Sequence, residues 1–121
     1  CGSAGLFATL EDCITLVQLY LHDGKLGDFE YCSAEMMQSL LKDWTPTRQA
    51  GRSLGWDMDQ VGEQIWLRHT GFTGTTVLMN LTTKQAMILL TNRIHQYEDT
   101  PSYNRLREEL ILLYEQEAVY K

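Results

Sequence analysis

The sequence predicts an α+β domain in which an antiparallel sheet of about four strands is flanked by helices. Two observations support this prediction. Apolar and polar residues alternate in the runs 64–69 and 76–81, which is the period-two pattern of half-buried strands. Three other segments repeat their apolar residues at intervals of three and four, which is typical of amphipathic helices.

The first helix is expected to begin after Thr9. This residue stands three positions before Asp12, which is the spacing of a capping box. We expect the helix to end at Asp23 and Gly24, because glycine readily adopts the left-handed conformation that closes a helix. Its apolar stripe consists of Leu10, Cys13, Ile14, Val17 and Leu21.

A second, shorter helix is expected to be capped by Ser33 and to end near Pro46. The residues expected to face inward on it are Met36, Met37, Leu40 and Leu41. Residues 46–52 are polar and predict a loop. Residues 53–59 predict a short strand in which Gly55 favours a bulge.

The third apolar run, 86–90, has no polar member on either face. Such a run is typical of a central strand with both faces covered. After it, Thr100 is expected to cap the last helix, with Pro101 in the first helical position. The apolar repeat of that helix consists of Tyr103, Leu106, Leu110, Leu113 and Tyr114.

Composition excludes several classes of partner. The 121 residues are 44% hydrophobic, and 16 acidic against 10 basic residues give a net charge of −6. Because the bases are scattered, we expect no nucleic-acid partner. No apolar run approaches the roughly 20 residues that span a bilayer, so no membrane span is expected. The cysteines at positions 1, 13 and 32 lack metal-site spacing, and no metal or other cofactor is expected.

One stretch is rich in groups that can act chemically, and it lies between the first two strands. It reads His69-Thr70-Gly71-Phe72-Thr73-Gly74-Thr75. Its glycines allow the backbone to approach a ligand closely, and its side chains include hydroxyls and one imidazole. A histidine at a strand end can equally be structural, and the later threonines can be turn residues; both alternatives stay open.

The His-Thr-Gly-Phe-Thr-Gly run, taken with residues 2–9 upstream and 90–93 downstream, resembles the C-terminal part of the serine β-lactamase and penicillin-binding-protein family. More narrowly, it resembles the esterase-related branch in which the third motif, Lys-Thr-Gly, reads His-Thr-Gly. The chain starts at Cys1, and we expect this start to be a boundary in a longer sequence. The family's other motifs, Ser-x-x-Lys and Tyr-x-Asn, are expected in a preceding N-terminal part rather than here.

The resemblance implies a single domain, residues 1–121, that is the C-terminal part of a larger serine hydrolase. That hydrolase would cleave a small-molecule ester, amide or β-lactam by an acyl-enzyme route. The implied oxyanion donor is the backbone N–H of Phe72. His69 would stand at the lysine position of the motif, and Thr70 and Gly71 would bind substrate. The alternative is a non-catalytic interaction or scaffold domain with the same fold.

The resemblance also implies a partner. In the resembled fold the strand that begins here at Ala86 and ends at Thr91 has a neighbour from the N-terminal part. That neighbour is not in these residues, so the strand would offer unpaired backbone groups at a sheet edge. We therefore expect the chain to bind the N-terminal part of its parent protein, or to self-associate through residues 86–91. The leucines of the last helix are expected to leave an open apolar patch.

Overall fold

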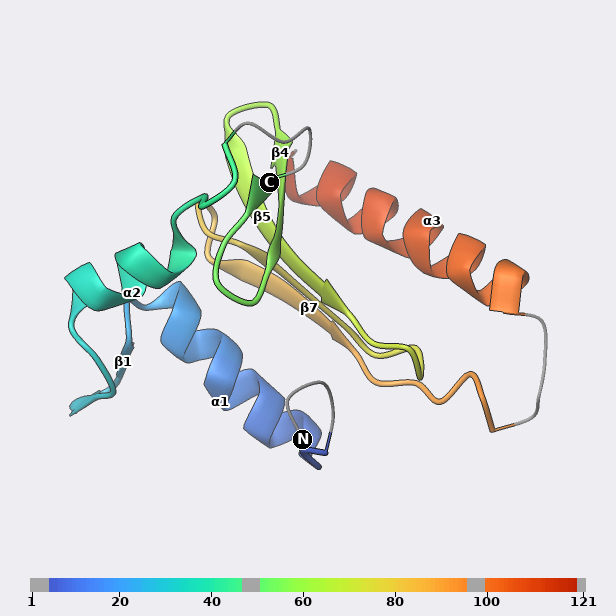
Figure 1. The fold of residues 1–121 in the computed structure, drawn as a ribbon, viewed down its shortest axis with the longest axis horizontal. Helices are drawn as coiled ribbons and strands as arrows, with labels where there is room; N and C mark the ends of the chain where they lie inside the picture. Colours follow the sequence, from blue (N-terminus) through green and yellow to red (C-terminus); the bar gives the residue numbers. More distant parts are fainter. Residues whose placement is uncertain (1–4, 47–50, 96–99, 120–121) are drawn as a thin grey trace.

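The computed structural model describes residues 5–46, 51–95 and 100–119 of the chain. The elements follow in the order α1 (Leu10–Leu21), β1 (Lys25–Leu26), β2 (Phe29–Glu30), α2 (Ala34–Leu41), β3 (Gly51–Arg52), β4 (Asp57–Val61), β5 (Gln64–Thr70), β6 (Thr76–Asn80), β7 (Gln85–Leu89) and α3 (Thr100–Val119). The larger sheet lies between α1 and α3, which cover its opposite faces (Figure 1). The predicted α+β class is confirmed.

The larger sheet has five strands in the order β3-β4-β5-β6-β7, and every neighbouring pair is antiparallel. The prediction of about four strands corresponds to the four longer strands, β4 to β7, and the two-residue β3 is the fifth. Trp66 and Leu67 of β5 are fully buried, as are Leu78 and Met79 of β6. Because consecutive strand residues point to opposite faces, both faces of the sheet are covered at its centre.

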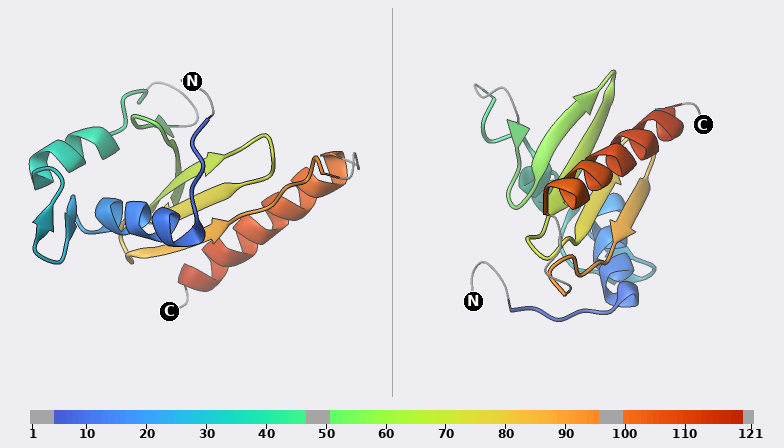
Figure 2. Two further views of the ribbon diagram at one scale, coloured as in Figure 1. Left: turned by 90° about the horizontal axis from the view of Figure 1, so that it is seen from below. Right: turned by 90° about the vertical axis from the view of Figure 1, so that its right-hand side faces the viewer.

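Each face of the sheet has its own core, and the two views in Figure 2 show the sheet between its helices. On the face that we call the α1 face, the buried residues are Val17, Leu21, Trp56, Leu67 and Met79. On the opposite α3 face, they are Trp66, Leu78, Ile111 and Ala118. No helix among the described residues combines the length and the apolar character needed to cross a bilayer.

Both N-caps predicted for the first two helices are confirmed. The Asp12 N–H donates to Thr9 Oγ1 at 3.2 Å, and the Thr9 N–H donates to the Asp12 carboxylate at 2.9 Å, which completes the capping box. These hydrogen bonds lower the pKa of Asp12. In α2 the Met36 N–H donates to Ser33 Oγ at 3.3 Å. After α1, Asp23 and Gly24 both adopt positive φ values, so the predicted helix end is confirmed.

The apolar stripes of these helices are narrower than predicted. Val17 and Leu21 are buried, whereas Leu10 and Ile14 are 44% and 41% exposed. In α2, Met37 is buried but Met36 is exposed, so the prediction that Met36 faces inward was wrong. Adjacent helical residues lie about 100° apart, and α2 contacts the protein along one side only.

The predicted strand 53–59 is correct only for residues 57–59, which belong to β4, and was wrong for residues 53–56. The chain turns there: the Ser53 N–H donates to the Trp56 carbonyl at 3.1 Å, and Arg52 pairs with Asp57 across the turn. Gly55 adopts φ +93°, so this glycine serves a reversal between β3 and β4 rather than a bulge within one strand. The predicted loop 46–52 is interrupted by β3 at its end, and residues 47–50 of it lie outside the described residues.

A small sheet that the sequence pattern did not indicate follows α1. Lys25 pairs with Glu30 and Leu26 with Phe29, and the turn between β1 and β2 contains Gly27 at φ +58°. Strands of two residues are too short to show a period, which explains why the pattern missed them.

The strand β7 lies at an edge of the sheet. Within the described residues it pairs only with β6, for example Ile88 with Val77. The prediction that both its faces are covered is confirmed: Ala86 and Ile88 pack on the α1 face, and Met87 on the α3 face. The central position predicted from its apolar run was wrong for this chain. The sheet edge expected from the family resemblance is confirmed, because the outer side of β7 has no neighbouring strand among the described residues.

Helix α3 begins at Thr100, the predicted cap, and so starts one position before Pro101, the predicted first helical residue. The residues that it buries against the sheet are Ile111, Glu115 and Ala118. The predicted leucine stripe is instead turned outward, since Leu106, Leu110 and Leu113 are 57%, 40% and 60% exposed. The predicted open apolar patch on this helix is therefore present.

Candidate functional site

The stretch 69–75, which the sequence distinguishes by its hydroxyl and imidazole groups, forms a tight loop between β5 and β6. The Gly71 N–H donates to the Thr75 carbonyl at 2.7 Å, and the Gly74 N–H donates to the Gly71 carbonyl at 3.1 Å. A Cβ at position 71 would lie 2.3 Å from Thr75 Oγ1, so a side chain there would require the Thr75 hydroxyl to move. Gly74 adopts φ +107°, which disfavours any side chain. We refer to residues 71–74 as the 71–74 loop.

All four carbonyl groups of the 71–74 loop accept hydrogen bonds from the C-terminal quarter of the chain. Arg107 Nη1 donates to the Gly71 carbonyl at 3.3 Å, and the Tyr103 hydroxyl donates to the Gly74 carbonyl at 2.6 Å. Between them, Arg93 donates twice, from Nε to the Phe72 carbonyl and from its backbone N–H to the Thr73 carbonyl. The directions of the peptide groups in the loop are thus fixed.

Phe72 lies at the exposed tip of this loop. Its side chain is 77% exposed, and the Arg93 guanidinium lies 4.5 Å from the centre of its ring. Among the described residues no acceptor contacts the Phe72 N–H. The structure therefore places this N–H in a loop whose carbonyl groups are occupied while the N–H itself is unpaired within that part of the chain.

His69 and Thr70 end strand β5 on opposite faces of the sheet. His69 pairs with Val77 and lies on the α1 face, where its ring packs edge-on against Trp56 at 6.3 Å between centroids. Thr70 pairs with Thr76, and strand alternation directs its side chain to the α3 face. Of the predicted site residues, His69 and Phe72 are exposed and Gly71 is half-buried, while the Thr70 side chain is directed to the opposite face from His69.

The supports of this loop were not predicted from sequence. Arg93, Tyr103 and Arg107 stand 21, 29 and 36 positions from the carbonyls that their side chains contact. No motif spacing connects such distant residues. The four-residue spacing of Tyr103 and Arg107 predicts only that the two side chains lie on the same face of a helix.

The expectation that the Ser-x-x-Lys spacing does not occur in this chain was wrong. Residues 39–42 read Ser-Leu-Leu-Lys. The structure nevertheless separates the two side chains: Ser39 lies near the end of α2, while Lys42 has left the helix with extended backbone and sits 5.2 Å from the Trp44 ring. Because serine and lysine do not share a helical turn, this segment lacks the arrangement in which the lysine could activate the serine.

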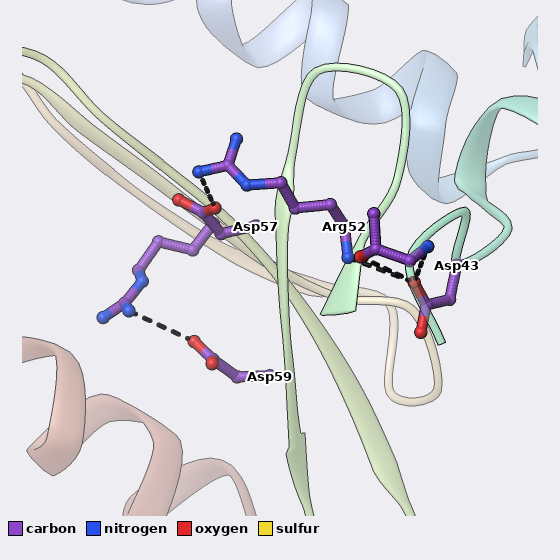
Figure 3. A network of polar contacts seen from close by, with 6 residues as sticks. Asp43, Arg52, Asp57 and Asp59 are labelled. Carbon is purple, nitrogen blue, oxygen red and sulfur yellow. Dashed lines mark hydrogen bonds and ion pairs between the residues drawn. The ribbon is translucent and has the colours of Figure 1, made fainter. Parts of the chain in front are cut away.

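A separate polar network lies at the β3 side of the sheet (Figure 3). Asp43 accepts from the backbone N–H groups of Thr45 and Arg52 at 2.7 and 3.1 Å, and the bond from Thr45 is the main cause that lowers the Asp43 pKa. Arg52 also pairs with Asp57 at 2.7 Å. These bonds fix the start of the sheet rather than a binding site.

The α3 face contains one buried carboxyl group. Glu115 is only 7% exposed, and this burial raises its pKa, with further raising by Asp59 and Glu108 and an opposing effect of Arg68. Arg68 pairs with Asp59 at 3.4 Å and with Glu108 at 3.0 Å. Within the described ranges no group of three or more His, Cys, Asp or Glu side chains could hold a metal ion.

Strand β5 ends at Thr70, and Gly71 opens the held 71–74 loop. Comparison with known proteins gives the class, a serine hydrolase-like domain. Residues 2–111 match the Beta-lactamase family, and the chain belongs to that family. Two relatives from Escherichia coli, from strains O157:H7 and K12, are both named "Putative D-alanyl-D-alanine carboxypeptidase". They are 27% and 26% identical to this chain over 113 residues.

That similarity covers 85% of this chain but only 26% of each relative, so the chain spans about a quarter of their length. The comparison with solved structures found no significant match.

Proposed function

We propose that residues 1–121 form one C-terminal portion of a larger β-lactamase-like serine hydrolase domain. In this proposal the chain supplies the third-motif strand and one wall of the active site. The nucleophile and its base come from the N-terminal part of the protein. The observation that supports this best is the 71–74 loop, whose four carbonyls are held while the Phe72 N–H is left to donate.

The proposed reaction is acyl transfer to a serine. The serine oxygen attacks the carbonyl carbon of an ester, amide or β-lactam, and its proton passes to the base. The substrate oxygen becomes an oxyanion, which accepts from the nucleophile's own N–H and from the Phe72 N–H. The leaving group departs with a proton, and water then hydrolyses the acyl-enzyme. One preorganised donor of this kind contributes about 3 kcal/mol to transition-state stabilisation.

His69, Thr70 and Gly71 are proposed to act on the substrate beside this donor. Gly71 lets the substrate approach the backbone, and the Thr70 hydroxyl is the candidate donor to a substrate carboxylate or carbonyl. Because strand alternation directs Thr70 to the α3 face and His69 to the α1 face, the two side chains would contact a substrate from opposite sides of the strand end. His69 takes the place of the motif's lysine. An imidazole is ordinarily mostly neutral at pH 7, whereas lysine is charged, so a neutral ester suits this site better than an anionic β-lactam does.

The names of the two relatives suggest a second substrate class, peptides that end in D-alanine. Their cleavage follows the same acyl-enzyme chemistry but requires recognition of a terminal carboxylate. With His69 in the motif, that recognition would rest on hydrogen bonds rather than on a lysine charge.

The test compares the 121-residue chain with the longer protein that contains it. We expect the chain alone to hydrolyse neither a chromogenic β-lactam nor an aryl ester, and to remain unlabelled by a fluorescent penicillin. The longer protein should be labelled at a serine N-terminal to Cys1. A Ser39→Ala variant is the control for the Ser-Leu-Leu-Lys segment. Labelling of the chain alone that Ser39→Ala abolishes would contradict the proposed division of roles.

The alternative is a non-catalytic interaction or scaffold domain of the same family. The histidine in place of lysine is the observation that favours it. The two readings differ in the sequence upstream of Cys1. The proposal requires both Ser-x-x-Lys and Tyr-x-Asn there, and a parent sequence without them would favour the scaffold.

A further inference from the structure

Helix α3 contacts the 71–74 loop through two side chains one turn apart. Tyr103 binds the Gly74 carbonyl, and Arg107 binds the Gly71 carbonyl. The two side chains also lie against each other, with the Arg107 guanidinium 5.8 Å from the centre of the Tyr103 ring. Both ends of the loop are therefore held by one rigid element.

The Tyr103 contact is geometrically tight. Its hydroxyl has a single proton, which goes to the Gly74 carbonyl, so in the hydrogen bond between Tyr103 and Thr91 the Thr91 hydroxyl is the donor. A Cβ at position 74 would lie 2.5 Å from Thr91 Oγ1 and 2.8 Å from the Tyr103 hydroxyl. The loop cannot shift toward α3 without disturbing these groups.

The Arg107 contact has a direct effect on Phe72. The Gly71 carbonyl and the Phe72 N–H belong to the same planar trans peptide group, so they point in opposite directions. Arg107 holds that carbonyl from the α3 side. The same carbonyl accepts from the Gly74 N–H at 3.1 Å, so Arg107 and the turn of the loop together fix this peptide group and with it the direction of the Phe72 N–H. A cation on the carbonyl also polarises the peptide group and strengthens its N–H as a donor.

The Arg107 guanidinium has few hydrogen-bond partners other than the Gly71 carbonyl among the described residues. Its Nη2 donates to Asn104 Oδ1 at 3.3 Å, within the same helix, and its Nε is buried without a hydrogen-bond partner among the described residues. A buried donor without a partner is a stability cost rather than a gain. The bond to the Gly71 carbonyl is therefore made by a side chain that leaves another of its own donors unsatisfied among the described residues.

We propose that Arg107 is a positioning residue for the candidate oxyanion donor: through the Gly71 carbonyl it sets the direction of the Phe72 N–H, and Tyr103 fixes the other end of the loop. This inference rests on the proposed function for its catalytic consequence. Its structural part, the control of one peptide group by α3, stands independently of that function.

The structural part is tested by the amide resonances of the chain in a ¹H–¹⁵N spectrum. In Arg107→Met, which keeps an apolar stem but loses the donor, the Phe72 amide should shift more than amides of β4. The matched control is Arg105→Met on the same helix, because the Arg105 side chain is exposed and its ion pair within the described ranges is with Glu109, at 2.9 Å. An unmoved Phe72 amide in Arg107→Met would overturn the proposal whatever the activity.

The catalytic part is tested in the longer protein with an aryl ester. Arg107→Met should lower kcat by about tenfold, a part of the 10²–10³-fold effect of losing a whole oxyanion donor, with little change in KM. Arg107→Lys should recover part of the loss, and Arg105→Met should behave as wild type. A shifted Phe72 amide with unchanged kcat would support the positioning and refute the proposed role of Phe72 in catalysis.

Should Arg107→Met fail to fold, two tyrosine variants test whether α3 holds the 71–74 loop through its other contact. Tyr103→Phe removes the bond to the Gly74 carbonyl. Tyr114→Phe removes an equivalent bond from the same helix to the Ala86 carbonyl, 2.9 Å long, within the sheet. The proposal expects faster amide exchange at Gly71 and Gly74 in Tyr103→Phe only. Equal exchange in the two variants would overturn it.

Discussion

The imidazole of His69 packs edge-on against the indole of Trp56, with 89° between the ring planes. Trp56 is itself buried and packs in the same way against Tyr20 of α1, at 5.3 Å between ring centroids. Position 69, which we propose to correspond to the motif's lysine, is therefore supported from the α1 face by two aromatic rings, while the imidazole remains exposed.

We predict that His69→Lys changes substrate preference in the longer protein. A lysine there adds a positive charge beside the candidate donor, and an exposed charge pair is worth up to about 1 kcal/mol. The ratio of kcat/KM for a carboxylate-bearing ester to that for its neutral analogue should rise by about fivefold. His22→Lys, which adds the same charge at an exposed position at the end of α1, should leave the ratio unchanged. No change in His69→Lys either would mean that position 69 is structural.

We predict that Gly74→Ala destabilises the chain more than Gly62→Ala does. Both glycines have positive φ, +107° and +62°, so both variants are strained by about 1–2 kcal/mol. Only at Gly74 would the new methyl group also collide with Thr91 and Tyr103, whereas a Cβ at Gly62 meets no atom within 4 Å. Urea unfolding should show Gly74→Ala to be the less stable by a further 1–3 kcal/mol or so. Equal losses would show that the loop can move away from α3.

We predict that Glu115→Gln stabilises the chain more at pH 7.5 than at pH 5. The pKa of Glu115 is raised in the folded state, mainly by burial, so folding favours its protonated form. The stability that this proton contributes is complete below the unfolded-state pKa of 4.5 and is lost as pH rises through the folded-state value. Glutamine mimics the protonated form at every pH.

The measurement is the free energy of urea unfolding of both proteins at the two pH values. Glu117→Gln, at an exposed position of the same helix, is the control for the loss of one negative charge. A stability gain of Glu115→Gln that is the same at both pH values, or that Glu117→Gln reproduces, would count against the prediction.

We predict that the chain self-associates in the absence of an N-terminal partner. The outer edge of β7 and the exposed leucines of α3 are the two surfaces that favour this, the first by strand pairing and the second by apolar contact. Sedimentation velocity from about 1 to 100 µM, a range of protein concentrations typical of association measurements, should show the sedimentation coefficient rising with concentration.

A variant separates the two surfaces. Leu113→Lys places a charge in the α3 patch at a side chain that is 60% exposed, so it should cost the monomer about 0.5 kcal/mol or less. Association that persists in Leu113→Lys indicates pairing at β7, and association that disappears indicates the α3 patch. A dispersed monomer of the wild-type chain at every concentration, with slow amide exchange along β7, would contradict the prediction.

Local sequence signals predicted the elements where the chemistry is local. The Thr9 and Ser33 caps, the positive φ at Gly24 and the alternation in β5 and β6 each involve residues within a few positions of one another. The same reasoning failed at Gly55, because a glycine is compatible with both a bulge and a turn. The pairing of Arg52 with Asp57, which decides between them, is not a local property.

The sequence by itself determined the helices, the alternating strands β5 and β6 and the family resemblance of the His-Thr-Gly run, because each depends on residues that are neighbours in the sequence. The short strands β1, β2 and β3 were not predicted. Only the tertiary structure decided which stripe of α3 faces the sheet. Leu106, Leu110 and Leu113 repeat as regularly as the buried residues Ile111, Glu115 and Ala118 do, and the sheet packs against only one of these sets. That choice brings Arg107 to the Gly71 carbonyl, 36 positions away, and so directs the Phe72 N–H. A contact between side chain and distant backbone leaves no period in the sequence, so packing alone could establish it.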